Sequence, residues 1–267
     1  MLRCRALDGI SGVIIDLDGV VWVGRTTVAG VQEAIQAIRR MGKRIVFTTN
    51  NSSKSRKEYV KMLRRSGGDA EEHEVLTSGY AAAEYLRRKK DAVRAHVVGE
   101  RGLREELVRA GIKILPEEKS EDATHLVVGL DRTINYRKIW FAMKSLMSGA
   151  EFVATNTDPT YPTELGLTPG AGAIVGAISG CSGRNPDVVL GKPYPYIMKM
   201  ALELLGTGAG QTAIIGDRLE VDVKAGKLCG IRTILVLSGV TKREDLRKVE
   251  RDMRPDFVFN SLSEVVS

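Results

Sequence analysis

A run of β-branched residues that ends in two aspartates is the strongest structural signal in this sequence. Residues 13–15 read Val-Ile-Ile, and Asp16 and Asp18 follow, with one leucine between the two acids. Several β-branched residues in succession are typical of a strand buried on both faces, as in a parallel sheet. Asp16 would then lie at the carboxyl end of its strand, where open α/β sheets bind their ligands. The chain is therefore expected to form an α/β fold with a parallel sheet and a ligand site beside Asp16.

The spacing of the two aspartates adds a chemical constraint. Carboxylates this close repel each other unless a positive charge, such as a divalent cation, neutralises them. An Asp-x-Asp sequence is also common in solvated turns, so on its own it could mark an ordinary connection between a strand and a helix. The pair becomes informative through the other segments that share its pattern.

A second apolar strand ends in side chains that suit phosphate. Residues 43–48 lead into Thr49, which is followed by Asn50 and Asn51. Hydroxyl and amide groups can donate hydrogen bonds to phosphate oxygens, and so can the backbone N–H groups of a helix expected to begin at Ser52. The alternative is that Thr49 only caps this helix.

Two segments in the last third of the chain complete the pattern. Lys192 stands between a glycine and a proline, just before a helix expected near Tyr194. Residues 212–216 form another apolar strand, which ends at Asp217, and Asp222 follows five positions later. A surface lysine and a turn-forming aspartate would be the ordinary interpretations. Four such segments in this order, three of them at expected strand ends, favour one shared site.

With these segments the chain resembles the haloacid dehalogenase superfamily of aspartate-nucleophile phosphohydrolases. The resemblance is to its 4-nitrophenylphosphatase-like and NagD-like phosphatases, with phosphoglycolate and pyridoxal phosphate phosphatases as relatives. The matching motifs are Asp-Leu-Asp-Gly-Val-Val from Asp16, Thr-Asn-Asn from Thr49, Ala-Thr-Asn-Thr-Asp from Ala154, Pro-Gly-Ala-Gly-Ala from Pro169, Gly-Lys-Pro from Gly191 and Gly-Asp-Arg-Leu-Glu-Val-Asp from Gly216. Val221 departs from the family pattern, in which threonine is frequent, and we expect little effect because the flanking acids are intact.

The resemblance implies a phosphatase mechanism for these residues. Asp16 would attack phosphorus and form an aspartyl phosphate, which water then hydrolyses. Asp18 would protonate the leaving alcohol and later deprotonate the attacking water. Lys192 would neutralise both the phosphoryl group and Asp16. The groups expected to bind the phosphoryl oxygens are Thr49 and the N–H groups around Asn50 and Asn51.

Magnesium is the expected cofactor. Mg²⁺ is a hard, octahedral cation that is bound by a few carboxylates, waters and substrate oxygens. Its expected ligands are Asp16, the backbone carbonyl of Asp18, and Asp217. By the resemblance, Asp222 would hold metal-bound waters, and direct ligation by Asp222 stays open.

The spacing of the motifs predicts two domains. About half of the chain separates Asn51 from Lys192, far more than a single crossover needs. This interval alternates apolar and amphipathic segments, with strands expected at 95–98, 125–130 and 151–155 and helices at 101–110 and 136–148. We expect a Rossmann-like parallel-sheet core, residues 1–78 plus 185–267, and an inserted α/β cap domain, residues 79–184. In the resembled superfamily, a cap at this point marks the group named above.

A shaped loop follows the last expected cap strand. It begins at Asn156 and Asp158 and continues through residues 159–172, which are rich in proline and glycine. The resemblance places such a loop over the active site, so Asn156 and Asp158 are candidate substrate-binding residues. The alternative is a loop stabilised by Asx turns. Trp22 is expected in core packing or in a flap, and the alternative is that it contacts the substrate.

The charge of the chain limits the classes of partner. A formal charge of +7 and a pI near 9.3 would attract anionic substrates and also raise the question of nucleic acid. Residues 87–90, however, end an expected helix, where cations complement the helix dipole. Residues 242–254 mix both signs, as a solvated helical face does. Aromatic residues make up only 5% of the chain, and no stacking platform accompanies the basic residues, so we expect no nucleic-acid partner.

No apolar run approaches the roughly 20 residues needed to span a bilayer, and the first residues lack a signal-peptide pattern. The three cysteines, Cys4, Cys181 and Cys229, are widely spaced, which argues against a disulfide framework or a zinc site. We therefore expect a cytoplasmic protein with no membrane partner.

The expected function is magnesium-dependent hydrolysis of small phosphorylated metabolites. One alternative is a phosphotransferase that passes the same phosphoryl group to an alcohol. Another is a binding protein for phosphorylated ligands that keeps the fold without turnover. Phosphoglycolate, sugar phosphates, nucleoside monophosphates and pyridoxal phosphate all remain open as substrates, because the cap loop would set the choice. The resemblance also allows a homodimer formed through the cap.

Overall fold

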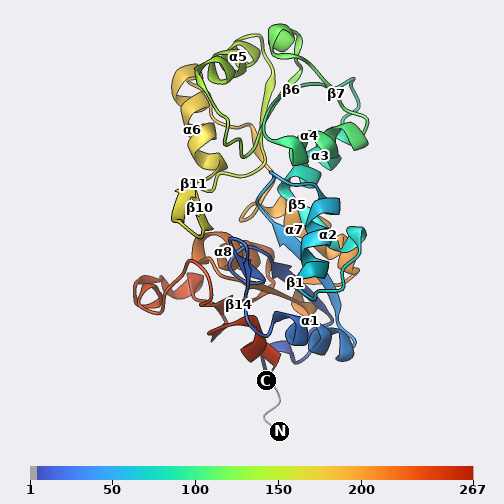
Figure 1. The fold of residues 1–267 in the computed structure, drawn as a ribbon, viewed down its shortest axis with the longest axis vertical. Coiled ribbons are helices and arrows are strands. Elements are labelled where there is room, and N and C mark those ends of the chain that lie inside the picture. The colour runs from blue at the N-terminus through green and yellow to red at the C-terminus, as the bar shows by residue number, and fades with distance from the viewer. Residues whose placement is uncertain (1–4, 267) are drawn as a thin grey trace.

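The computed structural model describes residues 5–266 and contains two parallel sheets, which Figure 1 shows one above the other. The larger sheet has six strands in the order β15-β14-β13-β1-β4-β5, and each neighbouring pair is parallel. Its strands are β1 (Gly12–Asp16), β4 (Arg44–Thr49), β5 (Val75–Thr77), β13 (Thr212–Gly216), β14 (Arg232–Val236) and β15 (Phe257–Phe259). The helices packed on it are α1 (Val31–Arg40), α2 (Arg56–Arg65), α7 (Pro195–Leu205) and α8 (Lys224–Cys229). The predicted parallel α/β fold is confirmed.

Successive residues of β1 pack into two different hydrophobic clusters. Val13 and Ile15 belong to a cluster that includes α1 and α2, whereas Ile14 belongs to a cluster that includes α7 and α8. All three side chains are fully buried. Side chains alternate between the faces of a strand, so a strand covered by helices on both faces must be apolar at every position. This packing explains the β-branched run. Because helices cover both faces of the sheet, a ligand can reach β1 only at its ends, and Asp16 lies at the carboxyl end.

The smaller sheet has five parallel strands in the order β12-β9-β8-β6-β7. Its strands are β6 (Arg94–Val98), β7 (Lys113–Ile114), β8 (His125–Val128), β9 (Glu151–Ala154) and β12 (Val188–Val189). Its neighbouring helices are α3 (Ser78–Arg87), α4 (Arg101–Arg109), α5 (Tyr136–Met147) and α6 (Ala171–Ser182). The strands and helices predicted for this interval lie within two residues of these bounds.

The two sheets share one hydrophobic cluster. Ile14 and Val46 of the larger sheet and Val97 and Val127 of the smaller sheet all belong to it, together with α3, which follows β5 directly. β12 belongs to the smaller sheet although it follows residue 185, where the sequence predicts the return to the core. The division of the chain into core and cap stays a prediction.

Two antiparallel hairpins lie near the carboxyl ends of the larger sheet. One pairs β2 (Trp22–Val23) with β3 (Thr26–Thr27), and the other pairs β10 (Thr160–Thr163) with β11 (Gly166–Pro169). Figure 1 shows the second hairpin, in yellow, between α6 and the larger sheet. The segment 159–172 is therefore more regular than the loop expected from its prolines and glycines.

The prediction that a helix begins at Ser52 is wrong, because α2 begins at Arg56. Asn51 Oδ1 accepts a hydrogen bond from Ser53 N at 3.0 Å, which bends the chain into an Asx turn. Ser55 then caps the helix in a capping box with Glu58. The backbone N–H groups at the start of α2 therefore come four residues later in the chain than the expected phosphate-binding groups.

The remaining chain is irregular. The segment 242–254 holds two 3₁₀ turns instead of a helical face, and its charged side chains are mostly exposed. The 3₁₀ turns are Arg5–Leu7, Glu72–Glu74, Glu117–Asp122, Ala209–Gln211, Asp245–Lys248, Arg251–Met253 and Leu262–Val266. Cys181 and Cys229 are unpaired, and Cys4 lies outside the described residues. Within residues 5–266, no helix has the length and apolar character needed to cross a membrane.

Candidate active site

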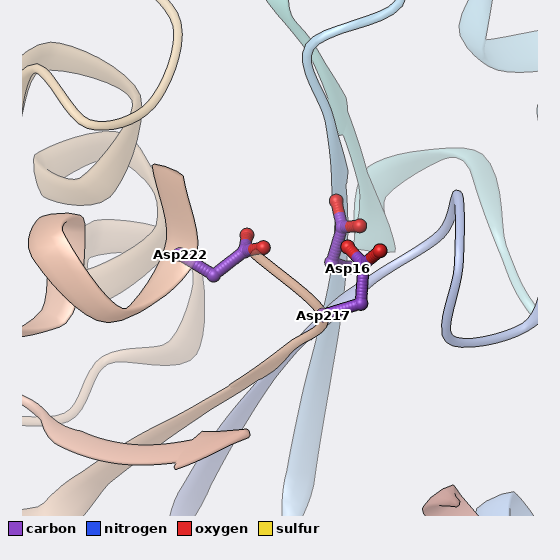
Figure 2. A group of neighbouring side chains, drawn as sticks. All are labelled: Asp16, Asp217 and Asp222. Carbon is purple, nitrogen blue, oxygen red and sulfur yellow. The ribbon is translucent and has the colours of Figure 1, made fainter. Parts of the chain in front are cut away.

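Three carboxylates converge at the carboxyl ends of the central strands β1 and β13. Asp16 is the last residue of β1, Asp217 follows β13, and Asp222 lies in a helical turn, Leu219–Val223, that leads into α8. All three are buried, and one oxygen of each lies within 4.8 Å of the others. Figure 2 shows Asp222 pointing from its turn toward Asp16 and Asp217, which lie next to each other. Adjacent parallel strands thus bring together acids from opposite ends of the chain.

Lys192 supplies a positive charge inside this cluster. Its Nζ is 2.5 Å from Asp16 Oδ1 and 2.7 Å from Asp222 Oδ1, and its side chain is 1% exposed. Asn50 fixes the backbone of Lys192: Asn50 Oδ1 accepts from Lys192 N at 2.9 Å, and Asn50 Nδ2 donates to Lys192 O at 2.8 Å. One lysine cannot neutralise three buried carboxylates, so the cluster is short of positive charge.

The pKa values of the cluster reflect this shortage. Burial raises the pKa of Asp16 well above its usual range, and the charge of Lys192 opposes this only in part. Burial, and then repulsion by Asp222, raise the pKa of Asp217 to about 7. Burial lowers the pKa of Lys192, but Asp16 and Asp222 outweigh burial and raise it overall. A bound cation would reverse the shifts of both carboxylates.

The donor set fits a divalent cation. Asp217 Oδ2 accepts a hydrogen bond from Val240 N at 2.6 Å, whereas Asp217 Oδ1 is buried without a hydrogen-bond partner in the described part of the chain. A buried carboxylate oxygen without a partner is costly, and a hard cation such as Mg²⁺ would satisfy it. Gly19 makes room for the Asp217 carboxylate, because it has a φ of 93° and a Cβ there would lie 2.3 Å from Asp217 Oδ2.

Asp18 is held beside the cluster by neutral donors. Thr49 Oγ1 donates to Asp18 Oδ2 at 2.8 Å, and Trp22 Nε1 donates to Asp18 Oδ1 at 3.0 Å. Trp22 is buried in the core, as predicted, and stacks on Tyr59 with ring centroids 6.3 Å apart. Tyr59 Oη donates to Asn51 O at 3.1 Å. The orientation of the Asp18 carboxylate is therefore fixed through both of its oxygens.

The other predicted residues of the Thr-Asn-Asn motif are already engaged within the protein. Thr49 Oγ1 accepts a hydrogen bond from Asn51 N at 3.0 Å in addition to its bond to Asp18. Asn50 Nδ2, besides holding Lys192, donates to Asp158 Oδ2 at 3.0 Å. Through these hydrogen bonds the motif positions Lys192 and Asp18, in addition to the phosphate-binding role that the sequence predicts for it.

Asn156 and Asp158 have different surroundings. Asn156 is buried: its Nδ2 donates to Asn50 O at 2.6 Å, and its Oδ1 accepts from Asp158 N at 3.1 Å in an Asx turn. Asp158 Oδ2 lies 3.9 Å from Arg218 Nη1, and Asp158 lines the cavity at the cluster. Burial raises the pKa of Asp158, and the charge of Arg218 opposes this. Asn156 thus holds the loop, and both residues line the cavity at the cluster.

Two residues to which the sequence analysis gave no role also line the site. Arg218 donates through Nη1 to Thr160 O at 3.0 Å and so ties the β10–β11 hairpin to the end of β13. Tyr161 lines the cavity from the same hairpin. The sequence held one signal for Arg218, because this residue directly follows Asp217 at the expected end of a strand. Tyr161 had no signal, because only the fold brings the hairpin over the larger sheet.

Two cavities open here. A small cavity of about 50 Å³ is lined by Asp16, Asp18, Lys192, Arg218 and Asp222, among others. A second cavity, of about 930 Å³, adjoins Asp18 but none of the other four. All predicted site residues meet at this place: Asp16, Asp18, Thr49, Asn50, Asn51, Asn156, Asp158, Lys192, Asp217 and Asp222.

Comparisons with known proteins agree with this geometry. The sequence model of haloacid dehalogenase-like hydrolases matches residues 13–113, and a second model, of HAD-hydrolase-like proteins, matches residues 189–265. Phosphoglycolate phosphatase 1A of Arabidopsis thaliana is 37% identical over 98% of this chain and 78% of its own length. The structure of a p-nitrophenyl phosphatase from Archaeoglobus fulgidus superposes with a TM-score of 0.88 at 41% identity, covering 96% of this chain and 98% of that one.

A third similar protein was solved with a metal ion. The structure of a glycerol phosphate phosphatase from Mycobacterium tuberculosis in complex with magnesium has a TM-score of 0.87 at 31% identity, covering 97% of this chain and 77% of that one. These likenesses span nearly the whole chain and include both sheets. The chain therefore belongs to the haloacid dehalogenase-like hydrolases, in their 4-nitrophenylphosphatase-like group.

Proposed function

We propose that this protein is a magnesium-dependent phosphatase that hydrolyses small phosphomonoesters through an aspartyl phosphate on Asp16. The observation that carries the proposal is the buried group of Asp16, Asp217 and Asp222 around the single cation Lys192, with Asp18 held alongside. The enzyme class, phosphoric monoester hydrolase, is that of the related proteins named above.

In the first step, Asp16 is the nucleophile. Lys192 binds Asp16 Oδ1, and Oδ2 has no hydrogen-bond partner among the residues described, so Oδ2 is the oxygen that would attack phosphorus. The new bond joins this oxygen to phosphorus as the bond from phosphorus to the leaving oxygen breaks. Asp18 donates a proton to the leaving oxygen, which departs as an alcohol. Lys192 stabilises the negative charge on the phosphoryl oxygens.

In the second step, water takes the place of the alcohol. Asp18, now ionised, accepts a proton from the water that attacks phosphorus, and the bond to Asp16 breaks to release inorganic phosphate. Trp22 and Thr49 hold the same carboxylate in place for both steps. Because both oxygens of Asp18 are held by hydrogen bonds, little reorientation is needed between its roles as acid and as base.

The metal would be held by Asp16, Asp217 and the backbone carbonyl of Asp18, with Asp222 binding it directly or through water. When bound, Mg²⁺ would supply positive charge to the phosphoryl oxygens and neutralise the excess of carboxylates. The magnesium complex of the glycerol phosphate phosphatase supports this choice of metal. We further propose that Thr49, Asn50 and Asn51 line the phosphoryl site and that Asp158 contacts the substrate. Asn156 would act by holding Asp158.

The wider organisation also belongs to this proposal. We propose a core of residues 1–78 and 185–267 and a cap of residues 79–184, in a cytoplasmic enzyme. A homodimer formed through the cap stays a prediction. The two alternatives, a phosphotransferase and a binding protein, are not favoured by the related proteins, which are phosphatases by name.

Hydrolysis of 4-nitrophenyl phosphate tests the proposal directly. We expect the purified protein to release nitrophenolate with added Mg²⁺, to stop in excess chelator, and to recover when Mg²⁺ is restored. One inorganic phosphate should form per nitrophenolate, and added alcohols should not lower that ratio. Full activity in chelator would overturn the metal requirement. A phosphate yield that falls as an alcohol is added would favour the phosphotransferase.

A further inference from the structure

The cavity of about 930 Å³ beside Asp18 has no role in the chemistry described so far. Its lining includes Asp18, Trp22 and Tyr59, together with Pro162 of the β10–β11 hairpin, but none of Asp16, Lys192, Asp217 and Asp222. It therefore adjoins the site on the side of the acid and not on the side of the nucleophile. In an in-line displacement the acid faces the leaving group. On the proposed function, a leaving group that extends past Asp18 and away from Asp16 enters this cavity.

The cavity carries an excess of positive charge. Four cations in its lining, Arg25, Lys54, Lys61 and Arg65, form no ion pair with any residue from 5 to 266. A fifth, Arg132, is neutralised by Glu100, whose Oε2 lies 2.7 Å from Arg132 Nη2. Of the acids in the lining, Glu58 is paired with Arg101, which leaves Asp18 and Glu164 unpaired. Four free cations thus face two free acids.

Of these four cations, Lys54 is the one that contacts an aromatic ring within residues 5–266. It is half-buried, and its Nζ lies 5.9 Å from the centroid of the Tyr59 ring. Tyr59 stacks on Trp22, and Trp22 donates its indole N–H to Asp18. Lys54 is therefore two ring contacts away from the acid that protonates the leaving group. Its backbone packs closely against α4, since a Cβ on Gly102 would lie 2.4 Å from Lys54 N.

We propose that this cavity selects leaving groups that carry a negative charge of their own, and that Lys54 is the residue that binds this charge. The substrate class is phosphomonoesters with a second anionic group, either a carboxylate or another phosphate. This inference rests on the proposed function, since it assigns the leaving group to the Asp18 side. The cations come from the β2–β3 hairpin and the segment around α2, so the selection depends on the larger sheet and its loops as well as on the β10–β11 hairpin.

Two pairs of probes separate charge from size. 3-Phosphoglycerate differs from glycerol 3-phosphate by a carboxylate, and fructose 1,6-bisphosphate differs from fructose 6-phosphate by a second phosphate. Each compound is measured as a competitive inhibitor of 4-nitrophenyl phosphate hydrolysis, which reports binding whether or not the compound is itself hydrolysed. In at least one pair, we expect the compound with the additional anionic group to bind about tenfold more tightly than its partner. One additional charge pair in a partly solvated cavity would give an effect of this size.

Lys57 provides a matched control for Lys54. It lies three residues further along, is exposed, forms no ion pair within the described chain, and does not line this cavity. Lys54→Met should abolish the preference for the compound with the additional anionic group. Lys57→Met removes the same net charge and should retain this preference. Lys61→Met serves as a second test within the cavity should Lys54→Met fold poorly, and it should weaken the same preference.

The outcomes are distinct. If Lys54→Met loses only the preference for 3-phosphoglycerate over glycerol 3-phosphate, Lys54 binds a carboxylate. If it loses only the preference for fructose 1,6-bisphosphate over fructose 6-phosphate, Lys54 binds a second phosphate. The inference is overturned if the wild-type protein shows no preference in either pair, or if Lys54→Met and Lys57→Met reduce it equally. Hydrolysis of 4-nitrophenyl phosphate in the same assay tests the proposed function separately, so failure of one claim cannot be mistaken for failure of the other.

Discussion

The two sheets differ in how cations neutralise the carboxylates near the ends of their strands. In the smaller sheet the acids after β6 and β8 each have their own cation: Asp131 Oδ2 lies 2.7 Å from Lys138 Nζ, and Glu100 Oε2 lies 2.7 Å from Arg132 Nη2. In the larger sheet three buried carboxylates share Lys192. Both sheets are parallel, with helices packed against them, so the architecture alone does not account for the difference.

The pKa shifts of these acids run in opposite directions. Burial raises the pKa of Asp131, but hydrogen bonds from Lys138 and Thr133 outweigh it, so the pKa is lowered overall. For Asp16 and Asp217 burial prevails, and both pKa values are raised. A strand end in a parallel sheet thus becomes a candidate site where the negative charge of its acids is left uncompensated, because a bound cation can then relieve the cost of burying that charge.

A matched pair of substitutions should separate the two sheets most strongly. Asp16→Asn should lower kcat/KM for 4-nitrophenyl phosphate by about 10⁴-fold or more, because an amide cannot attack phosphorus. Asp131→Asn should leave kcat/KM within about threefold but lower the free energy of unfolding by about 2 kcal/mol, since it leaves Lys138 without its partner. Steady-state kinetics and urea denaturation measure the two effects. If Asp16→Asn retained more than a few per cent of wild-type activity, the nucleophile assignment would be wrong.

Metal addition should stabilise the protein through the carboxylates of the larger sheet. With Mg²⁺ at about 100 times its dissociation constant, the free energy of unfolding of the wild-type protein should rise by about 3 kcal/mol relative to chelator. Asp217→Asn should lose most of this increase, because it removes a ligand. In chelator the variant should be more stable than the wild type, because the asparagine removes the repulsion between the Asp217 carboxylate and the carboxylates of Asp16 and Asp222. Thermal unfolding of both proteins with and without Mg²⁺ measures this, with Asp131→Asn as a control that keeps the full response.

The smaller sheet should respond to pH through a buried histidine. His96 in β6 is 2% exposed, its Nδ1 is 2.8 Å from Ser145 Oγ, and burial lowers its pKa from 6.5 to about 4. Because the unfolded chain binds the proton more tightly, stability should fall as the pH falls from about 6.5 toward 4, by about 2 kcal/mol at pH 5. His96→Asn should remove this part of the pH dependence. Equal slopes for wild type and variant between pH 7.5 and 5 would mean that His96 does not titrate as proposed.

Removing the indole N–H beside Asp18 should have the smallest effect. Trp22→Phe keeps the stacking on Tyr59 but loses the hydrogen bond to Asp18 Oδ1. Because alkyl leaving groups need the proton from Asp18 more than nitrophenolate does, kcat/KM for glycerol 3-phosphate should fall about tenfold further than kcat/KM for 4-nitrophenyl phosphate. Tyr59→Phe is the control and should affect both substrates alike. An equal loss for both substrates in Trp22→Phe would reduce Trp22 to a packing role.

The features predictable from sequence were those that follow from local pattern. The β-branched run at residues 13–15 indicated a strand buried on both faces, and the acids at its end and at Asp217 indicated the edge at which a site forms. Parallel neighbours align their carboxyl ends, so these residues had to meet once the strand order was β13-β1-β4. The site followed from the same rule as the fold.

The features that escaped prediction depend on side-chain hydrogen bonds within turns or on contacts between distant segments. The Asx turn at Asn51 competes locally with a helix, so α2 starts later than its polar residues suggest. Arg218 gains its place only because Thr160 of the β10–β11 hairpin accepts its hydrogen bond. The pairing of Trp22 with Asp18 likewise needs the turn between them to close. None of these contacts leaves a periodic trace in the sequence.

Chemical trapping of the covalent intermediate tests the central claim most directly. Protein turning over 4-nitrophenyl phosphate with Mg²⁺ is quenched in acid and reduced with borohydride, which converts an aspartyl phosphate to homoserine. Peptide fragmentation by mass spectrometry then separates Asp16 from Asp18, because Leu17 lies between them. We predict homoserine at Asp16 alone, dependent on substrate and absent from Asp16→Asn. Homoserine at Asp18, or at another carboxylate of the site, would contradict the account.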